Sequence, residues 1–206
     1  KDLNLKSNAL FGTKNYSYTE TSSVSPSELM TGSDWLNQPN KSQKKSLDTE
    51  AVYWQFVYEN YQTVDQGLEK TIAHLFDQDE FENTGIYSIS QHIRDTLTKY
   101  MKYDEKTNTQ SENVLEDFLN QKISGNDVLF ASSAVEAFRH YNIPARYVEG
   151  YLLKSDAIDE EGNATLTSKD GHAWVEVYFD GMGWLPIDVT PGYYYDVYTL
   201  MNMVAT

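Results

Sequence analysis

The chain has 206 residues, of which 40% are apolar and 14% aromatic, enough for the core of one folded domain. Its 16 Lys and Arg against 31 Asp and Glu give a formal net charge of −15, which would repel nucleic acid and anionic lipid surfaces. No run of about 18 apolar residues is present, so we expect any membrane contact to come only through segments outside this chain.

Residues 1–48 are rich in Ser, Thr, Asn and Lys, which predicts an irregular segment packed on a domain formed by residues 49–206. Trp35 is expected to anchor this segment. From Glu50 onward, apolar residues recur at helical spacing with a break near Thr63, which predicts two helices.

A further helix is predicted from Ser88, because Ser88 and Gln91 have the Ser-x-x-Gln form of a capping box. Apolar spacing continues that helix for about four turns. A short helix is expected ahead of Gly125, and another from about Asp127, which Pro144 stops.

Histidines occur at three helical positions, His74, His92 and His140, that we expect to be exposed. His74 has no second His, Cys or carboxylate pair at metal-ligand spacing. The sequence therefore predicts neither a metal nor another cofactor.

After Pro144 the pattern changes to strands. Apolar and polar residues alternate in 146–153, in 172–179 and again up to Asp188, with a hairpin turn signal at Asp180-Gly181. The acidic stretch 155–170 is expected to be a mobile surface loop. Helices followed by an antiparallel sheet predict an α+β architecture.

The predicted hairpin brings two side chains together. A turn centred between residues 180 and 181 pairs positions whose numbers add to about 361, and His172 and Asp188 come within one of that value. We therefore expect Asp188 beside His172. Considered alone, the pair could be a cross-strand ion pair that holds the hairpin, worth a few tenths of a kcal/mol.

Four motifs follow one another along the chain: 125–132 (GNDVLFAS), 142–151 (NIPARYVEGY), 171–178 (GHAWVEVY) and 183–191 (GWLPIDVTP). Together they resemble the core of the bacterial transglutaminase-like family, over residues 86–191. The resemblance implies a papain-like fold and a Cys-His-Asp catalytic triad. His172 falls on the second triad position and Asp188 on the third.

The nucleophile position of the family is occupied here by Asp127, and the chain contains no cysteine. A carboxylate at a helix N-terminus is favoured by the helix dipole and can pair with a protonated His172. Asp127 could instead be an N-cap that stabilises the helix by about 1 kcal/mol. A carboxylate attacking an amide would form a mixed anhydride from a poor nucleophile, so we predict loss of acyl transfer.

A cleft is expected between the helix at Asp127 and the strands that carry His172 and Asp188. Gln121 is placed where a papain-like enzyme could have an oxyanion-stabilising amide, although an exposed Gln at a helix end is the alternative. The other predicted cleft residues are Trp174, Trp184, Tyr151 and the tyrosines at 193–195.

The main functional hypothesis is a non-catalytic module that binds a peptide or protein, within a larger bacterial extracytoplasmic protein. Its extracytoplasmic location is what the resemblance and the abrupt chain ends imply. One alternative is a hydrolase that uses Asp127 and His172 as an acid–base pair. A low pKa of an ion-paired Asp127 would favour the binding module, and a raised pKa in a dry cleft would favour the hydrolase.

Two further alternatives stay open. If Asp127 replaces a natural Cys, the chain would be an active transglutaminase or cysteine protease. A structural spacer would have a filled cleft and no ligand.

Overall fold

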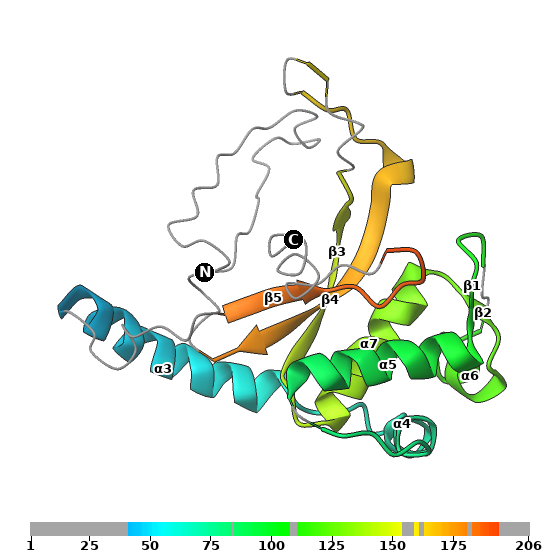
Figure 1. Cartoon of the computed structure of the whole chain (residues 1–206), viewed down its shortest axis with the longest axis horizontal. Helices are drawn as coiled ribbons and strands as arrows, with labels where there is room; N and C mark the ends of the chain where they lie inside the picture. Colours follow the sequence, from blue (N-terminus) through cyan, green and yellow to red (C-terminus); the bar gives the residue numbers. More distant parts are fainter. Residues whose placement is uncertain are drawn as a thin grey trace. The chain divides into compact units, whose positions relative to one another are not determined.

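The computed structural model of the chain describes residues 41–83, 85–107, 111–153, 159–160, 163–180 and 183–193 (Figure 1). The predicted anchor Trp35 lies outside these residues, as does most of the predicted irregular segment. Residues 41–48, which were expected within that segment, form the first turns of helix α3 (Lys41–Tyr61).

The two helices predicted on either side of Thr63 are both present. They are α3 and α4 (Glu69–Phe76). The second helix begins later than its apolar spacing suggests, because residues 66–68 form a turn in which the Leu68 N–H donates to the Asp65 carbonyl at 2.9 Å. The ring of Tyr53 in α3 contacts Tyr178 in the sheet, edge to face at 6.0 Å.

Helix α5 (Ile86–Tyr100) has the predicted length of about four turns but a different start. It begins after Gly85, whose φ of +128° is a conformation that favours glycine. Ser88 is not the N-cap, since its hydroxyl lies inside the helix and donates to the Gly85 carbonyl at 2.9 Å. The predicted capping box is therefore wrong.

The helical histidines differ in their burial. His74 is exposed, as predicted, whereas His140 is half-buried and hydrogen-bonded to Asp77. His92 is only 8% exposed and its ring stacks on Phe81 at 4.0 Å. The predicted exposure of His92 is wrong because the loop after α4 folds back over this face of α5.

Two sheets complete the fold of the described residues. The parallel pair is β1 (Lys102–Tyr103) with β2 (Ser124–Gly125). The antiparallel sheet has the order β3-β4-β5, formed by β3 (Ala145–Tyr151), β4 (Gly171–Phe179) and β5 (Gly183–Ile187) (Figure 1). The three predicted strands are thus confirmed.

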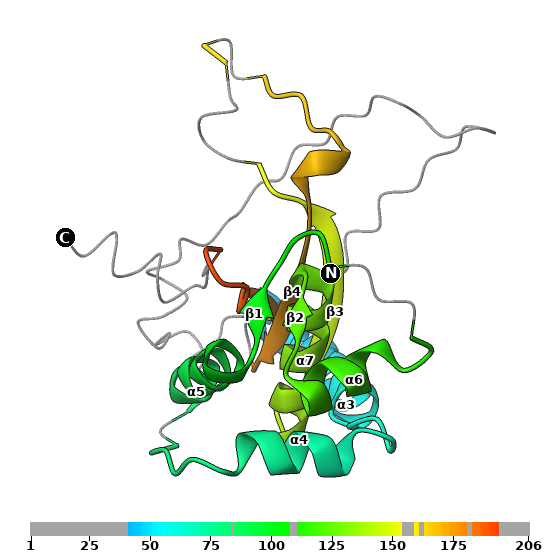
Figure 2. The same cartoon turned by 90° about the vertical axis from the view of Figure 1, so that its right-hand side faces the viewer.

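Helix α7 (Asp127–His140) is the centre of the core. It packs on β3 and β4, and helices α4, α5 and α6 (Val114–Gln121) pack on it in turn (Figures 1 and 2). Ala134 and Ala137 are fully buried, and their small side chains allow a close helix–sheet approach. The predicted α+β class is confirmed, and the first turn of α7 lies beside the start of β4.

Gly125 fixes the entry into α7 by close packing. A Cβ built at this position would lie 2.5 Å from Cε2 of Phe118, which is fully buried. We expect Gly125→Ala to lower the free energy of unfolding by about 1–3 kcal/mol through overpacking, measured by urea denaturation.

Phe118→Leu provides the matched test of that cause. If the clash is with the Phe118 ring, the double variant should lose less unfolding free energy than the two single variants lose together. The difference should be at least about 0.5 kcal/mol. Strict additivity would contradict the explanation.

Candidate active site

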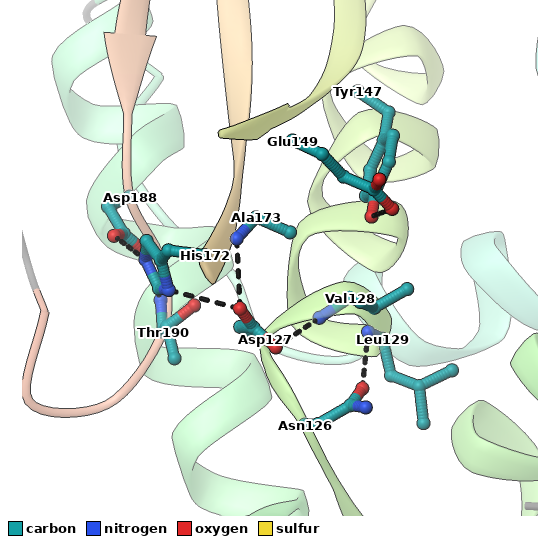
Figure 3. Close-up of polar contacts among 10 residues, drawn as sticks. All are labelled: Asn126, Asp127, Val128, Leu129, Tyr147, Glu149, His172, Ala173, Asp188 and Thr190. Atoms are coloured by element: carbon teal, nitrogen blue, oxygen red, sulfur yellow. Dashed lines mark hydrogen bonds and ion pairs between the residues drawn. The ribbon is translucent and has the colours of Figure 1, made fainter. Parts of the chain in front are cut away.

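Asp127 is the first residue of α7 but does not cap it. The N-cap is Asn126, whose side-chain oxygen accepts from the Leu129 N–H at 3.2 Å (Figure 3). The helix is therefore capped without Asp127. The Asp127 carboxylate is left to reach from the helix start to β4.

His172 lies between two carboxylates. Its Nε2 is 2.6 Å from Asp188 Oδ2 and its Nδ1 is 3.1 Å from Asp127 Oδ2 (Figure 3). His172 is 7% exposed and Asp188 6%. The structure thus brings together the three residues that the motifs singled out, from the start of α7, the start of β4 and the segment just after β5.

The hairpin register explains the contact between His172 and Asp188. The last paired residues are Val175 and Ile187, so an extension of the register places Asp188 opposite Trp174. Trp174 and His172 are two residues apart in the strand and therefore share a face of the sheet. Asp188 reaches His172 diagonally, and the predicted proximity is confirmed with a register shifted by one.

Each carboxylate also accepts backbone N–H groups. Asp127 Oδ2 accepts from Ala173 at 2.9 Å, just beyond the last β4–β5 pair, and Oδ1 accepts from Val128 at 3.0 Å. Asp188 Oδ1 accepts from Thr190 at 2.9 Å. These bonds hold both carboxylates in fixed positions around the imidazole.

A buried arginine lies behind Asp188. Arg94 of α5 donates from Nε and Nη2 to the Asp188 carbonyl at 3.2 and 3.1 Å. The guanidinium therefore links α5 by hydrogen bonds to the segment just after β5.

The two carboxylates shift the protonation of the site. Burial would lower the pKa of His172, but the hydrogen bonds to Asp127 and Asp188 and their negative charges outweigh it and raise that pKa to about 9. Burial would raise the pKa of Asp127, but the bonds from His172 and the Ala173 N–H lower it overall. At neutral pH the site is an imidazolium held between carboxylates.

Tyr193 covers the imidazole. Its ring stacks on His172 with centroids 4.6 Å apart and planes at 28°. A turn places it there: the Tyr193 N–H donates to the Thr190 carbonyl at 3.0 Å, and Gly192 has a φ of +90°. Of the three tyrosines predicted to line the cleft, Tyr193 lies at the site, and 194–195 lie outside the described residues.

Tyr103 supports this cover and was not predicted as a site residue. Its ring lies edge-on to Tyr193 and to Phe130 of α7, each at 6.1 Å. Burial, the neighbouring Tyr193 and the charge of Asp127 raise the pKa of Tyr103. The only sequence signal was its place in the short extended piece after α5.

A hydrogen-bonded pair on β3 lies on the α7 side of the site. The Tyr147 hydroxyl donates to Glu149 at 2.5 Å (Figure 3). Burial, that bond and the negative charges of Glu149 and Asp127 raise the pKa of Tyr147. Glu149 pairs with Ala173 in the register, which places it next to the backbone that Asp127 binds. Strand alternation alone did not single out this pair.

Two of the predicted cleft residues, Trp174 and Tyr151, lie near His172 in the sheet. Trp174 is half-buried, its ring 6.4 Å from the His172 ring, and its buried indole N–H has no hydrogen-bond partner in the described structure. Tyr151 is 57% exposed at the end of β3 and pairs with Gly171.

Trp184 and Gln121 are not brought to the triad by any described contact. Trp184 pairs with Tyr178, six residues and about 20 Å along β4 from His172. Its indole N–H donates to Tyr53 at 2.8 Å, so it packs the sheet against α3. Gln121 is exposed and donates to Asp117 of its own helix at 2.9 Å.

Within the described ranges, no group of three or more His, Cys, Asp or Glu side chains could hold a metal ion. In the same part of the chain, no helix is both long and apolar enough to cross a membrane.

Comparison with known proteins gives one family match and two related sequences. A family model described as the transglutaminase-like superfamily matches residues 77–189. The uncharacterized protein YebA of Bacillus subtilis is 36% identical over 87 residues, which are 40% of this chain and 12% of YebA. A protein-glutamine gamma-glutamyltransferase of Pseudomonas aeruginosa is 36% identical over 77 residues, 37% of this chain and 11% of the enzyme. The chain thus matches only a small part of either relative.

Solved structures with a similar fold have low identity. The periplasmic domain of TgpA from Pseudomonas aeruginosa has 21% identity and a TM-score of 0.48, covering 66% of this chain and 47% of that domain. A putative cysteine protease from Cytophaga hutchinsonii has 23% identity and a TM-score of 0.42, covering 63% of this chain and 40% of the protease.

The protonation of the site predicts a limited pH range of maximal stability. Because folding raises the pKa of His172 from its ordinary value of 6.5 to about 9, its contribution is complete below pH 6.5 and is lost as the pH rises through 9. Because the pKa of Asp127 is lowered from 3.8, its contribution is present above that pH and is lost as the pH falls through the folded value. The alkaline loss should reach at most about 3 kcal/mol in urea denaturation between pH 7 and 9.5.

His172→Gln should flatten the alkaline part of this profile, although it lowers stability at pH 7. The control His74→Gln removes an exposed imidazole and should leave the profile unchanged. An equally steep alkaline loss in His172→Gln would show that other groups cause it.

Proposed function

The chain belongs to the transglutaminase-like superfamily, and on this basis we propose that it is a non-catalytic member whose site binds a peptide or protein without transforming it. One observation carries the proposal: Asp127 Oδ2 lies at the head of α7, 3.1 Å from His172 Nδ1. In the proposal, Asp127 occupies the place of the nucleophilic thiol in active members. No cysteine in the chain could take over that role.

The chemistry of the site supports loss of acyl transfer. A carboxylate is a weak nucleophile toward an amide, and its product would be a mixed anhydride. The pKa of His172 is about 9, so the imidazole is protonated at pH 7 and is paired with Asp127, where an active member would pair it with a thiolate.

The hydrolase alternative fits the site less well. An acid–base pair for hydrolysis needs one carboxyl group with a raised pKa. The pKa of Asp127 is lowered, which is the property expected of an ion-paired carboxylate in a binding module. The hydrolase is therefore not our proposal.

A second candidate function has a specific observation in its favour. The His172–Asp188 pair is buried and short, at 2.6 Å, which is the arrangement that orients the histidine of a working triad. If the natural residue at 127 is Cys, the domain is a transglutaminase or cysteine protease. The same experiment tests both candidates.

The ligand class in the proposal is polypeptide. The Pseudomonas relative is named for transfer of the γ-glutamyl group of protein glutamine, and we propose that this domain keeps affinity for polypeptide after losing the transfer step. We extend the proposal to a location outside the cytoplasm, within a longer protein. Cleavage of the domain by protease added to intact cells would support that location, and full protection would contradict it.

The decisive variant is Asp127→Cys. A thiol at this helix start, next to His172, should have a lowered pKa and react with iodoacetamide at pH 6 at least about tenfold faster than a free cysteine. The parent protein should incorporate no amine into a glutamine peptide. Amine incorporation by Asp127→Cys would show that the remaining machinery is complete.

Val128→Cys is the matched control, because this residue is in the same helix turn and is 38% exposed. It shares the helix dipole but not the bond to His172. The proposal is supported if Asp127→Cys is labelled fast while Val128→Cys and Asp127→Cys/His172→Gln are labelled slowly. That result would mean that the triad lacks only its thiol. Equal labelling of all three would contradict it, and amine incorporation by the parent would overturn the non-catalytic function.

A further inference from the structure

A separate hollow lies between α5 and the loop that joins α4 to α5 (Figure 2 shows this loop). Its volume is about 500 Å³, within the range of sites for small molecules. Asp127, His172 and Asp188 are not among its lining residues.

The charge of this hollow is strongly negative. Glu80, Glu82 and Asp95 line it, and none of them has a basic partner within the described ranges. The one lysine in the lining, Lys99, is already paired with Asp79 at 2.7 Å. A bound cation would therefore meet carboxylates that no other described charge neutralises.

A buried histidine supplies an independent sign of a ligand. His92 lines the hollow, is 8% exposed, and its Nε2 lies 2.8 Å from the Phe76 carbonyl. Because a carbonyl can only accept, Nε2 carries the proton, and in the neutral ring Nδ1 is an acceptor. Nδ1 has no partner in the described structure. This nine-tenths buried side chain thus has an unused acceptor beside the hollow.

The rest of the lining matches an organic cation. Thr96 is 3% exposed, and its hydroxyl has no described hydrogen-bond partner. Phe81 stacks on His92 at 4.0 Å, and Tyr87 is 45% exposed, so aromatic surface adjoins the carboxylates. Aromatic faces attract ammonium groups and cover alkyl chains. A metal fits poorly, since no metal ligand set is found among the described side chains.

We propose that this hollow binds a small organic cation through a primary ammonium group. The ammonium donates to the His92 Nδ1 and the Thr96 hydroxyl, with Glu82 and Asp95 supplying the countercharge. The alkyl part of the ligand lies on Phe81 and Tyr87. This site does not depend on the function proposed for the triad.

The test is a titration of the ¹⁵N-labelled chain with 1,5-diaminopentane, followed by NMR. We expect saturable shifts of the Thr96 amide and of the His92 Nδ1 resonance, with a Kd on the order of 1 mM. The uncharged analogue 1,5-pentanediol should cause no saturable shift. Glu82→Gln/Asp95→Asn should weaken binding by about fivefold or more.

The matched control is Glu69→Gln/Glu112→Gln, which removes the same charge from two exposed residues outside the hollow. Unchanged affinity in this control would support a local site. Equal weakening in both double variants would mean only a general attraction to an acidic protein. That result, equal binding of the diol, or no saturable shift at His92 and Thr96 would overturn the proposal.

Discussion

The structure depends on one electrostatic constraint, the placement of the His172 imidazolium between Asp127 and Asp188. A charged imidazole buried without partners would lose several kcal/mol of hydration. Here two carboxylates compensate for it, and each of them also accepts backbone N–H groups from Ala173, Val128 or Thr190. Because these groups belong to the start of α7, the start of β4 and the segment just after β5, the array fixes the position of the helix start against the sheet.

The same constraint limits the chemistry. In a cysteine triad the protonated histidine is paired with a thiolate, which is the nucleophile. Here the protonated ring faces carboxylates on both sides, which together raise the pKa of His172 to about 9, and a carboxylate is a poor nucleophile toward an amide. We propose that the ion pair with Asp127 keeps the histidine in place and removes the nucleophile. For this reason we interpret the site as a binding module.

The parts of the structure that local sequence signals determine were predictable. The start of α7 follows from the glycine and Asn-Asp at 125–127, and the contact between His172 and Asp188 follows from the hairpin turn. Long-range packing accounts for the rest. Asn and Asp both cap helices well. Here Asn126 is the N-cap, and the Asp127 carboxylate instead accepts a hydrogen bond from β4. Trp184 was expected in the cleft, but the strand register places it at the other end of β4, where it packs beside α3.

Helix α5 contributes residues to two separate polar regions, the site around His172 and the hollow beside the α4–α5 loop. Successive residues of a helix are rotated by about 100°, so neighbours in sequence face different surroundings. Arg94 is buried and donates to the Asp188 carbonyl behind the triad, whereas Asp95 and Thr96 line the hollow. A cation in the hollow is thus attracted by carboxylates that have no part in the array around His172. The burial of His92, which helical periodicity did not predict, belongs to this second region: the loop after α4 covers its ring with Phe81 and leaves Nδ1 without a described partner.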